Sequence, residues 1–489
     1  MLFNSPGFLF VYLPITLGIY VLLRRGGGVL ATSWLLIGSL FFYGWWEPRF
    51  LPILAASILL NFAFGTIIAR SRGTGQLALA AAVAANLLAL AYFKYAAFLV
   101  GSVAAILGTS WAVPGIDLPI GISFFTFTQI AYLVDVHRGR VKEADPLRYS
   151  LFVTYFPHLI AGPILHHAEM MPQFEDPRPR DRGRDLAVGL SLLSVGLFKK
   201  VIVADTIASF STPVFETFDK GWRLSPVEAW IGALAYTLQI YFDFSAYCDM
   251  ALGISRMFGI LLPINFLSPY KATSIVDFWR RWHITLSRFL RDYLYIPLGG
   301  NRHGPARRFV NLFATMMLGG LWHGASWNFV IWGCLHGAYL TINHGFRALR
   351  PPRGTPSRAG AVLSWLLTFV CVVSAWVFFR AETLRGATNM LKTMFGFRSS
   401  YGPATWSVGV LILLSTVLAW CVLAPNVYDV MRRSEPGLYP ESFPKGSPEP
   451  IGAWTPTLRS GLVYGSLCAV AIYGLLGLSR PSEFLYFRF

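Results

Sequence analysis

His323 is an ionisable residue in a stretch of chain that is otherwise almost entirely apolar. The stretch runs from Phe309 to His344, and arginines stand on both sides of it. Ionisable side chains at membrane depth are costly, so each of them is a candidate for function. Basic residues at both ends indicate that both ends lie on the same side of a membrane. We therefore predict a hairpin that enters the membrane and returns, with His323 at its tip.

The glycines at the expected tip support this hairpin. Gly319, Gly320 and Gly324 interrupt the apolar run next to His323. The first arm, from Phe309 to Trp322, would be about 21 Å long as a helix. Because this is shorter than the roughly 30 Å hydrocarbon core of a bilayer, His323 is expected well inside the membrane.

His283 is the second histidine with a distinctive setting. It lies in the segment from Asp277 to Tyr295, DFWRRWHITLSRFLRDYLY, which is dense in arginine and aromatic residues. As one helix, this segment would place Trp282, Leu286, Phe289 and Tyr293 on one face and Arg280, His283, Ser287 and Arg291 on another. Such a helix could lie flat on the membrane surface or press its polar face against a water-filled tunnel.

We expect other polar residues in apolar surroundings to have supporting roles. Asp243 and Asp249 stand six residues apart, which does not place them on one helix face. We expect each to neutralise a nearby arginine or to hold a histidine tautomer. His336 stands 13 residues after His323 and is turned away from it on a regular helix, so we interpret it as a packing residue or as one that supports the site from behind.

The chemistry that suits these histidines is general base catalysis. The sequence contains no GxSxG, HExxH, Walker or GxGxxG motif. An imidazole, with an ordinary pKa near about 6.5, can take a proton from a hydroxyl as that hydroxyl attacks an activated acyl group. The five cysteines form no CxxC pair, which argues against a zinc site, and we predict no bound metal.

The elements that would position these residues are membrane spans. The 489-residue chain is 55% hydrophobic, 16% aromatic and only 13% charged, and its mean hydropathy is +0.52. These values exclude a disordered chain, a coiled coil and an ordinary cytosolic enzyme, and they allow about ten spans. The net charge of +17 does not indicate nucleic-acid binding, because most lysines and arginines stand in short loops between apolar runs.

The order of spans and loops predicts the topology. Pro6–Leu23 is followed by Arg24 and Arg25, which indicates a retained first span with the N-terminus outside. Leu151–Leu165 is short and broken by proline and glycine, and basic loops flank it, the second at 178–184. It is expected to be a re-entrant segment buried in protein. The chain therefore divides into N-terminal spans (1–150), a core with the histidines (151–350) and C-terminal spans (351–489), within one membrane domain.

These blocks together resemble a known family, the membrane-bound O-acyltransferases (MBOAT), in the bacterial AlgI-type branch of alginate O-acetyltransferase membrane subunits. The resemblance covers nearly the whole chain, and it is carried by MLFNSPGFLFVYLPI, LPIGISFFTFTQIAYLVDVHRGR, FPHLIAGPI, YFDFSAYCDMA, FWRRWHITLSRFLRDYLYIPLGGNR, NLFATMMLGGLWHGASWNFVIWGCLHG and the closing FLYFRF. His323, in LWHGASW, matches the proposed catalytic histidine of the family. His283, in RRWHITLS, matches its second signature histidine.

The resemblance implies a fold and an activity. The fold would be an all-α polytopic membrane protein, a ring of about 10–12 transmembrane helices with re-entrant segments around a central tunnel. The activity would be O-acyl transfer, with acetyl taken from cytoplasmic acetyl-CoA, used as a substrate and not as a bound cofactor. The acetyl group would pass to a periplasmic SGNH-type acetyltransferase or an acyl carrier. The protein would lie in the lipid bilayer of a bacterial inner membrane, and no nucleic-acid partner is expected.

The acceptor stays open at this point. His158 and the segment HHAEMMPQF depart from the pattern of alginate members. Alginate, cellulose, other exopolysaccharides, peptidoglycan and teichoic-acid D-alanylation all remain candidates. Two other classes also remain: a transporter that moves an acyl carrier or glycan without chemistry, and a structural subunit of a partner enzyme. The His-bearing broken segments do not pair across two halves of the chain, which disfavours an inverted-repeat transporter.

Overall fold

The protein is built from helices. The structure, a computed structural model, describes residues 1–71, 75–112, 115–141, 145–175, 181–349, 357–398, 408–440, 452–477 and 484–485. Within these ranges the chain forms no β-sheet, and Pro263 and Leu438 make an isolated parallel bridge. Residues 178–180 of the basic loop at 178–184 lie outside the described residues, and so do Arg350 and Arg353, two of the arginines that follow His344.

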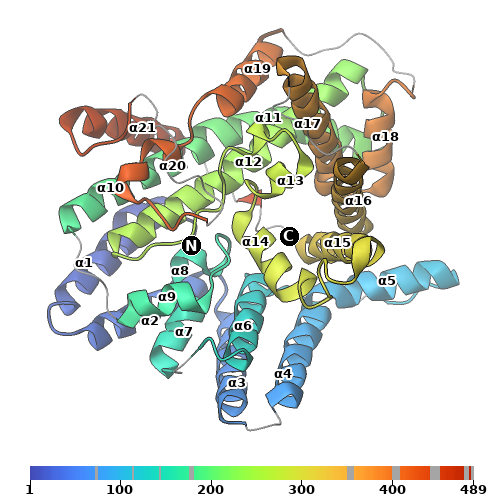
Figure 1. Cartoon of the computed structure of the whole chain (residues 1–489). Helices are drawn as coiled ribbons and strands as arrows, with labels where there is room; N and C mark the ends of the chain where they lie inside the picture. Colours follow the sequence, from blue (N-terminus) through green and yellow to red (C-terminus); the bar gives the residue numbers. More distant parts are fainter. Residues whose placement is uncertain are drawn as a thin grey trace.

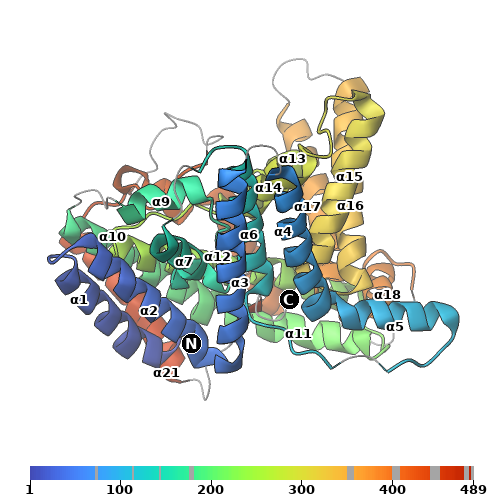
Figure 2. The same cartoon turned by 90° about the horizontal axis from the view of Figure 1, so that it is seen from below.

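The first third of the chain forms helices around one side of the molecule (Figure 1). These are α1 (Leu13–Leu23), α2 (Gly28–Trp46), α3 (Leu51–Arg70), α4 (Gly75–Leu90), α5 (Ala96–Leu107) and α6 (Ile122–His137). A π-helical turn, Ala91–Tyr95, joins α4 to α5. Helix α5 points away from the body in both views (Figures 1 and 2).

The rest of the chain supplies the centre and the other side of the molecule. The middle helices are α7 (Pro146–Thr154), α8 (Phe156–Leu159), α9 (His167–Glu175), α10 (Arg182–Phe198), α11 (Asp205–Asp219), α12 (Pro226–Met257), α13 (Ile275–Trp279), α14 (Ile284–Leu290), α15 (Gly304–His323) and α16 (Trp327–Leu349). The last ones are α17 (Arg358–Arg380), α18 (Leu384–Met394), α19 (Val408–Leu423), α20 (Val427–Val430) and α21 (Leu458–Leu476).

Helix α12 is the central element, and Figure 1 shows it crossing the middle of the molecule. It has 32 residues, and nearly all of them are buried. Its N-terminus is closed by a capping box, in which Ser225 Oγ accepts from the Glu228 backbone N–H and Glu228 accepts from the Ser225 N–H. A helix that is apolar on all sides must be surrounded by other elements, and α12 provides the wall on which the candidate site is built.

Six segments among the described residues are long and apolar enough to cross a membrane. They are Gly28–Trp46, Pro48–Arg70, Gly75–Leu107, Arg182–Asp219, Arg358–Arg380 and Leu458–Leu476. Large apolar side chains on them are exposed, for example Leu59, Leu77 and Leu363, as lipid contact requires. Together with two shorter apolar helices, Phe8–Leu23 and Val408–Leu423, they confirm the prediction of an all-α polytopic membrane protein.

The segment Leu151–Leu165 is broken and buried, as predicted. Helix α7 ends at Thr154, α8 lasts four residues, and Gly162 then takes a left-handed φ of +140°. Every residue from Leu151 to Leu165 is buried. Irregular backbone at membrane depth is tolerated only where protein covers it. The rest of the protein covers this segment.

Helices α15 and α16 form the predicted hairpin, with His323 as the last residue of its first arm. The two helices run side by side (Figure 2). The predicted length of the first arm was wrong, however, because α15 begins at Gly304 and has 20 residues. Pro305 stands in its first turn, where a missing N–H costs nothing. The arm is therefore about 30 Å long instead of 21 Å, so its length no longer indicates how deep His323 lies in the membrane.

Glycines allow the close approach of these two helices. A Cβ atom added at Gly320 would overlap the carbonyl oxygen of Phe329 and lie 2.9 Å from Gly333 Cα. Small residues at such positions are typical of helix pairs in membranes. The hairpin that carries His323 therefore depends on Gly320.

We predict that Gly320→Ala lowers the apparent melting temperature of the purified protein by about 2 °C or more, because the helices must separate to admit the methyl group. Gly345→Ala, on the same hairpin, is the matched control, since no atom lies within 4 Å of its added Cβ. Thermal unfolding in detergent measures both. Equal melting temperatures for the two variants would contradict the proposed close packing.

Candidate active site

His323 lies inside the protein at the end of α15. Its side chain is buried, at 4% exposure. Its ring centroid is 4.9 Å from that of Trp322, 5.2 Å from Trp332 of α16 and 5.1 Å from Phe379 of α17. Three helices therefore surround the imidazole with aromatic rings, which hold it in place and keep bulk water away from it.

His283 is fully buried beside His323. It immediately precedes α14, and its ring lies 4.8 Å from Phe244 of α12 and 6.4 Å from the ring of His323, measured between centroids. The sequence placed these residues 40 positions apart. The structure brings the two predicted histidines together at the meeting point of α12, α14 and α15.

The predicted continuous helix Asp277–Tyr295 was wrong, and the break falls at His283. Helix α13 ends at Trp279, and His283 takes a left-handed backbone conformation with φ of +44° before α14 begins. The preceding extended segment explains the break: the Leu267 N–H donates to Arg281 O, and the Ile284 N–H donates to Asn265 O. A left-handed non-glycine residue costs roughly 1–2 kcal/mol, so this turn is maintained by its surroundings.

Asn265 fixes the orientation of the His283 ring. Its Oδ1 atom accepts from the backbone N–H of Thr285 at 3.1 Å and from Thr285 Oγ1 at 3.0 Å. Because a backbone N–H can only donate, this atom is the amide oxygen. His283 Nδ1, 3.2 Å from the same oxygen, therefore carries the hydrogen and donates it. Nε2 is then the ring atom that can accept a proton, as a general base requires.

The broken segment supports the same network. The Ile164 N–H donates to Thr285 Oγ1 at 2.9 Å, and this hydroxyl donates to Asn265. The irregular backbone of Leu151–Leu165 is thus connected to His283 through two side chains. No sequence motif indicated Asn265, because its partners His283 and Thr285 lie 18 and 20 residues further along the chain, beyond the reach of helix periodicity.

We predict that Asn265→Ala lowers the catalytic rate about tenfold, because the His283 ring loses the acceptor that sets its tautomer, a loss of about 1.4 kcal/mol. Asn61→Ala is the matched control, since Asn61 is an equally buried asparagine that bonds Asn86 between α3 and α4. Steady-state rates of the two purified variants measure the effect. Equal rates for the two variants would show that Asn265 does not set the orientation of the His283 ring for catalysis.

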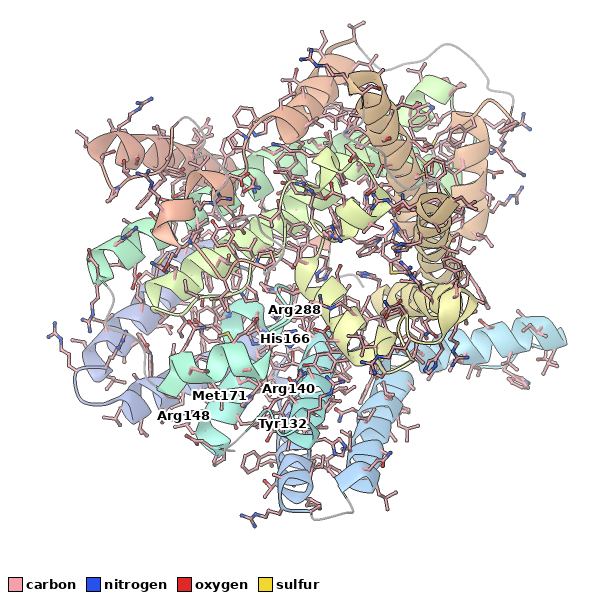
Figure 3. The ribbon with its side chains drawn as sticks, in the orientation of Figure 1. Tyr132, Arg140, Arg148, His166, Met171 and Arg288 are labelled. Atoms are coloured by element: carbon pink, nitrogen blue, oxygen red, sulfur yellow. The ribbon has the colours of Figure 1, made fainter. Side chains whose placement is uncertain are left out.

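Two of the arginines near His283 in the sequence form ion pairs with carboxylates. Arg288 makes a two-pronged ion pair with Glu169, at 2.6 and 2.8 Å, and donates to His166 Nε2 at 3.0 Å. Figure 3 shows Arg288 beside His166. Arg281 pairs with Asp277. Both guanidinium groups are thus held by carboxylates.

The two aspartates of α12 pair with lysines, which corrects the predicted arginine or histidine partners. Asp243 lies 2.8 Å from Lys200 and also accepts from the Leu485 N–H. Asp249 lies 2.7 Å from Lys199 and accepts from the Tyr428 hydroxyl at 2.6 Å. Both carboxylates are charge-compensated structural groups of the core.

His336 is packed among aromatic rings, one of which, Trp332, also contacts His323. It is fully buried, its Nδ1 accepts from Trp279 Nε1 at 3.2 Å, and its ring packs on Trp332 at 4.7 Å. In the part of the chain that the structure describes, no group of three or more His, Cys, Asp or Glu could hold a metal ion.

Comparison with known proteins decides the family. The family model described as "MBOAT, membrane-bound O-acyltransferase family" matches residues 39–381. The chain belongs to the membrane-bound O-acyltransferases. It is thus an enzyme that transfers acyl groups and a multi-pass membrane protein, and the transporter and structural-subunit alternatives lose their support.

Relatives of this membrane-bound O-acyltransferase act on different acceptors. It is 44% identical to a peptidoglycan O-acetyltransferase of Helicobacter pylori, over 81% of this chain and 80% of that one. It is 39% identical to a probable alginate O-acetylase AlgI of Pseudomonas putida, over the whole of both chains. A teichoic acid D-alanyltransferase of Bacillus subtilis is 27% identical, over 54% of this chain and 69% of that one.

Proposed function

We propose that this O-acyltransferase moves acetyl from cytoplasmic acetyl-CoA to a hydroxyl acceptor, for O-acetylation of a cell-surface polysaccharide. The relatives at 39% and 44% identity are named for acetylation and match at least four fifths of this chain, whereas the D-alanyltransferase matches about half. Acetyl is therefore a better-supported acyl group than D-alanyl.

The observation that carries the proposal is the pair of buried histidines. Their ring centroids lie 6.4 Å apart. Two hydrogen bonds of about 2.8 Å each span a similar distance, so one small polar group could contact both rings. A hydroxyl between the rings would give its proton to one imidazole and form a hydrogen bond with the other.

The proposed reaction is a direct acyl transfer. His323 removes the proton of the acceptor hydroxyl as its oxygen attacks the acetyl carbonyl carbon, forming a C–O bond. The C–S bond of the thioester then breaks, and the departing thiolate takes the proton from His323 and leaves as CoA thiol. The aromatic residues around His323 exclude water, which would otherwise hydrolyse the thioester.

The proposal includes a tunnel that opens the site to both faces of the membrane. On this account the protein lies in a bacterial inner membrane with its N-terminus outside, and its basic loops, such as Arg138 and Arg140 after α6, face the cytoplasm. The acetyl group would continue to an SGNH-type acetyltransferase or an acyl carrier in the periplasm.

Peptidoglycan is the second candidate acceptor, because the Helicobacter pylori relative is the more identical of the two acetyltransferases compared above. The experiment that tests the proposal deletes the gene and restores it, then measures ester-linked acetate separately in the muropeptides and in the secreted polysaccharide. Loss from the polysaccharide supports the proposal, and loss from muropeptides alone shifts the acceptor to peptidoglycan. Unchanged acetate in both, with loss of D-alanine esters, contradicts it.

A further inference from the structure

Lys94 is a buried lysine that the reaction described above does not use. It lies in the π-helical turn Ala91–Tyr95, is 9% exposed, and interrupts a long apolar run. An ammonium group at membrane depth is costly unless polar groups of the protein surround it. Helical turns of this type occur frequently at functional sites.

The partners of Lys94 are at the end of α15. Its Nζ donates to the carbonyl oxygen of Trp322 at 2.6 Å and to that of His323 at 3.3 Å. It also donates to Ser123 Oγ of α6 at 3.1 Å. The neighbouring Tyr95 hydroxyl donates to the Leu321 carbonyl at 2.9 Å. Two consecutive residues therefore satisfy the carbonyls of the last three residues of α15.

The chemistry of helix ends explains why these contacts matter. The last carbonyls of a helix have no partner within it, and they carry the negative end of the helix dipole. The chain leaves α15 in extended backbone at Gly324, with φ of −166°, and does not close the helix with a left-handed turn. An external cation and a hydroxyl then hold the terminal turn, whose last residue is His323.

We propose that Lys94, assisted by Tyr95, is a positioning residue for the acyl transfer. Its ammonium group fixes the C-terminal carbonyls of α15 and so holds the His323 imidazole against His283. This inference rests on the proposed role of His323 as the base. Lys94 itself touches neither substrate nor the reacting atoms in this account.

The first test compares two lysines that bind carbonyls at helix ends. Lys271→Met is the matched control for Lys94→Met, because Lys271 donates to the Ala424 carbonyl at 2.6 Å, just after α19, a helix without a candidate catalytic residue. The reconstituted protein is given acetyl-CoA and its acceptor or partner. Lys94→Met should lower the kcat of acetyl transfer about 10- to 100-fold and leave the KM for acetyl-CoA within about twofold of the wild type. Lys271→Met should keep the wild-type kcat. Equal kcat values for Lys94→Met and wild type would overturn the proposal.

A second measurement separates positioning from a general structural role. Lys94→Met is combined with His323→Ala, and the small residual rate is measured. If Lys94 acts through His323, the double variant is no slower than His323→Ala alone. If the losses multiply, the proposal is wrong. A His323→Ala variant with full activity would instead refute the proposed function itself, so the two failures are distinguishable.

Tyr95→Phe keeps the proposal testable if Lys94→Met does not fold. It removes a single hydroxyl, which donates to Leu321. We expect kcat to fall about threefold with unchanged KM, because the same carbonyl end is less firmly held. Lys94→Arg should recover part of the kcat lost in Lys94→Met, since it restores a cation. An unchanged kcat in Tyr95→Phe would count against the proposal.

Discussion

His323→Ala abolishes O-acetylation of the envelope polymer while the protein still accumulates in the membrane: this is the largest effect expected from the site. General base catalysis typically contributes about 10²- to 10⁴-fold to a rate, and the His323 ring lies 6.4 Å from that of His283, measured between centroids. The close approach of α15 and α16 is at Gly320 and Gly333, so alanine at position 323 removes ring contacts but should leave the hairpin folded. The measurement is ester-linked acetate in the envelope polymer, together with the amount of protein in the membrane.

The matched control is His137→Ala, since His137 is an exposed histidine at the end of α6. Polymer acetate should match the wild type in that variant. If the His323→Ala variant has as much polymer acetate as the wild type, at an equal amount of protein in the membrane, His323 is not the catalytic base.

His283→Asn is expected to lower acetylation about 100-fold, the second-largest effect. Asparagine is chosen because it tolerates the left-handed conformation that His283 adopts, whereas other residues would add backbone strain. The variant removes the second imidazole and leaves the turn before α14 intact. The measurement is the rate of acetyl transfer by the purified protein.

Glu435→Asn is the control, because Glu435 is an exposed residue with a similar φ of +46°. Its rate should equal that of the wild type. If His283→Asn keeps the wild-type rate as well, His283 is a packing residue and the two-histidine site is wrong.

Local signals in the sequence predicted part of this site. Paired basic flanks and glycines predicted the hairpin that carries His323, because charge asymmetry and small residues act over a few turns of helix. The broken run Leu151–Leu165 was predicted for the same reason. These features depend on neighbours in the chain.

Other parts of the site depend on distant partners and could not be predicted. The aromatic and polar spacing of Asp277–Tyr295 indicated one helix, but backbone contacts to Asn265 and Leu267 impose a turn at His283. Asp243 and Asp249 pair with lysines from the preceding π-helical turn, Lys199–Ala204, which no spacing rule indicated. Lys94 bonds Trp322 of α15, which stands 228 positions later in the chain. The position of Lys94 in an apolar run indicates a buried partner but not which residue it is.

The central claim is that this chain performs acyl transfer with His323 as the base, and one measurement tests it most directly. The purified protein in lipid vesicles is given radiolabelled acetyl-CoA and its acceptor or partner, and release of CoA thiol is followed together with acetyl transfer. The account predicts both products from the wild type in equal amounts, and both at about 1% of that rate or less from His323→Ala. Equal rates from the two proteins, or none from the wild type with its partner present, would contradict it.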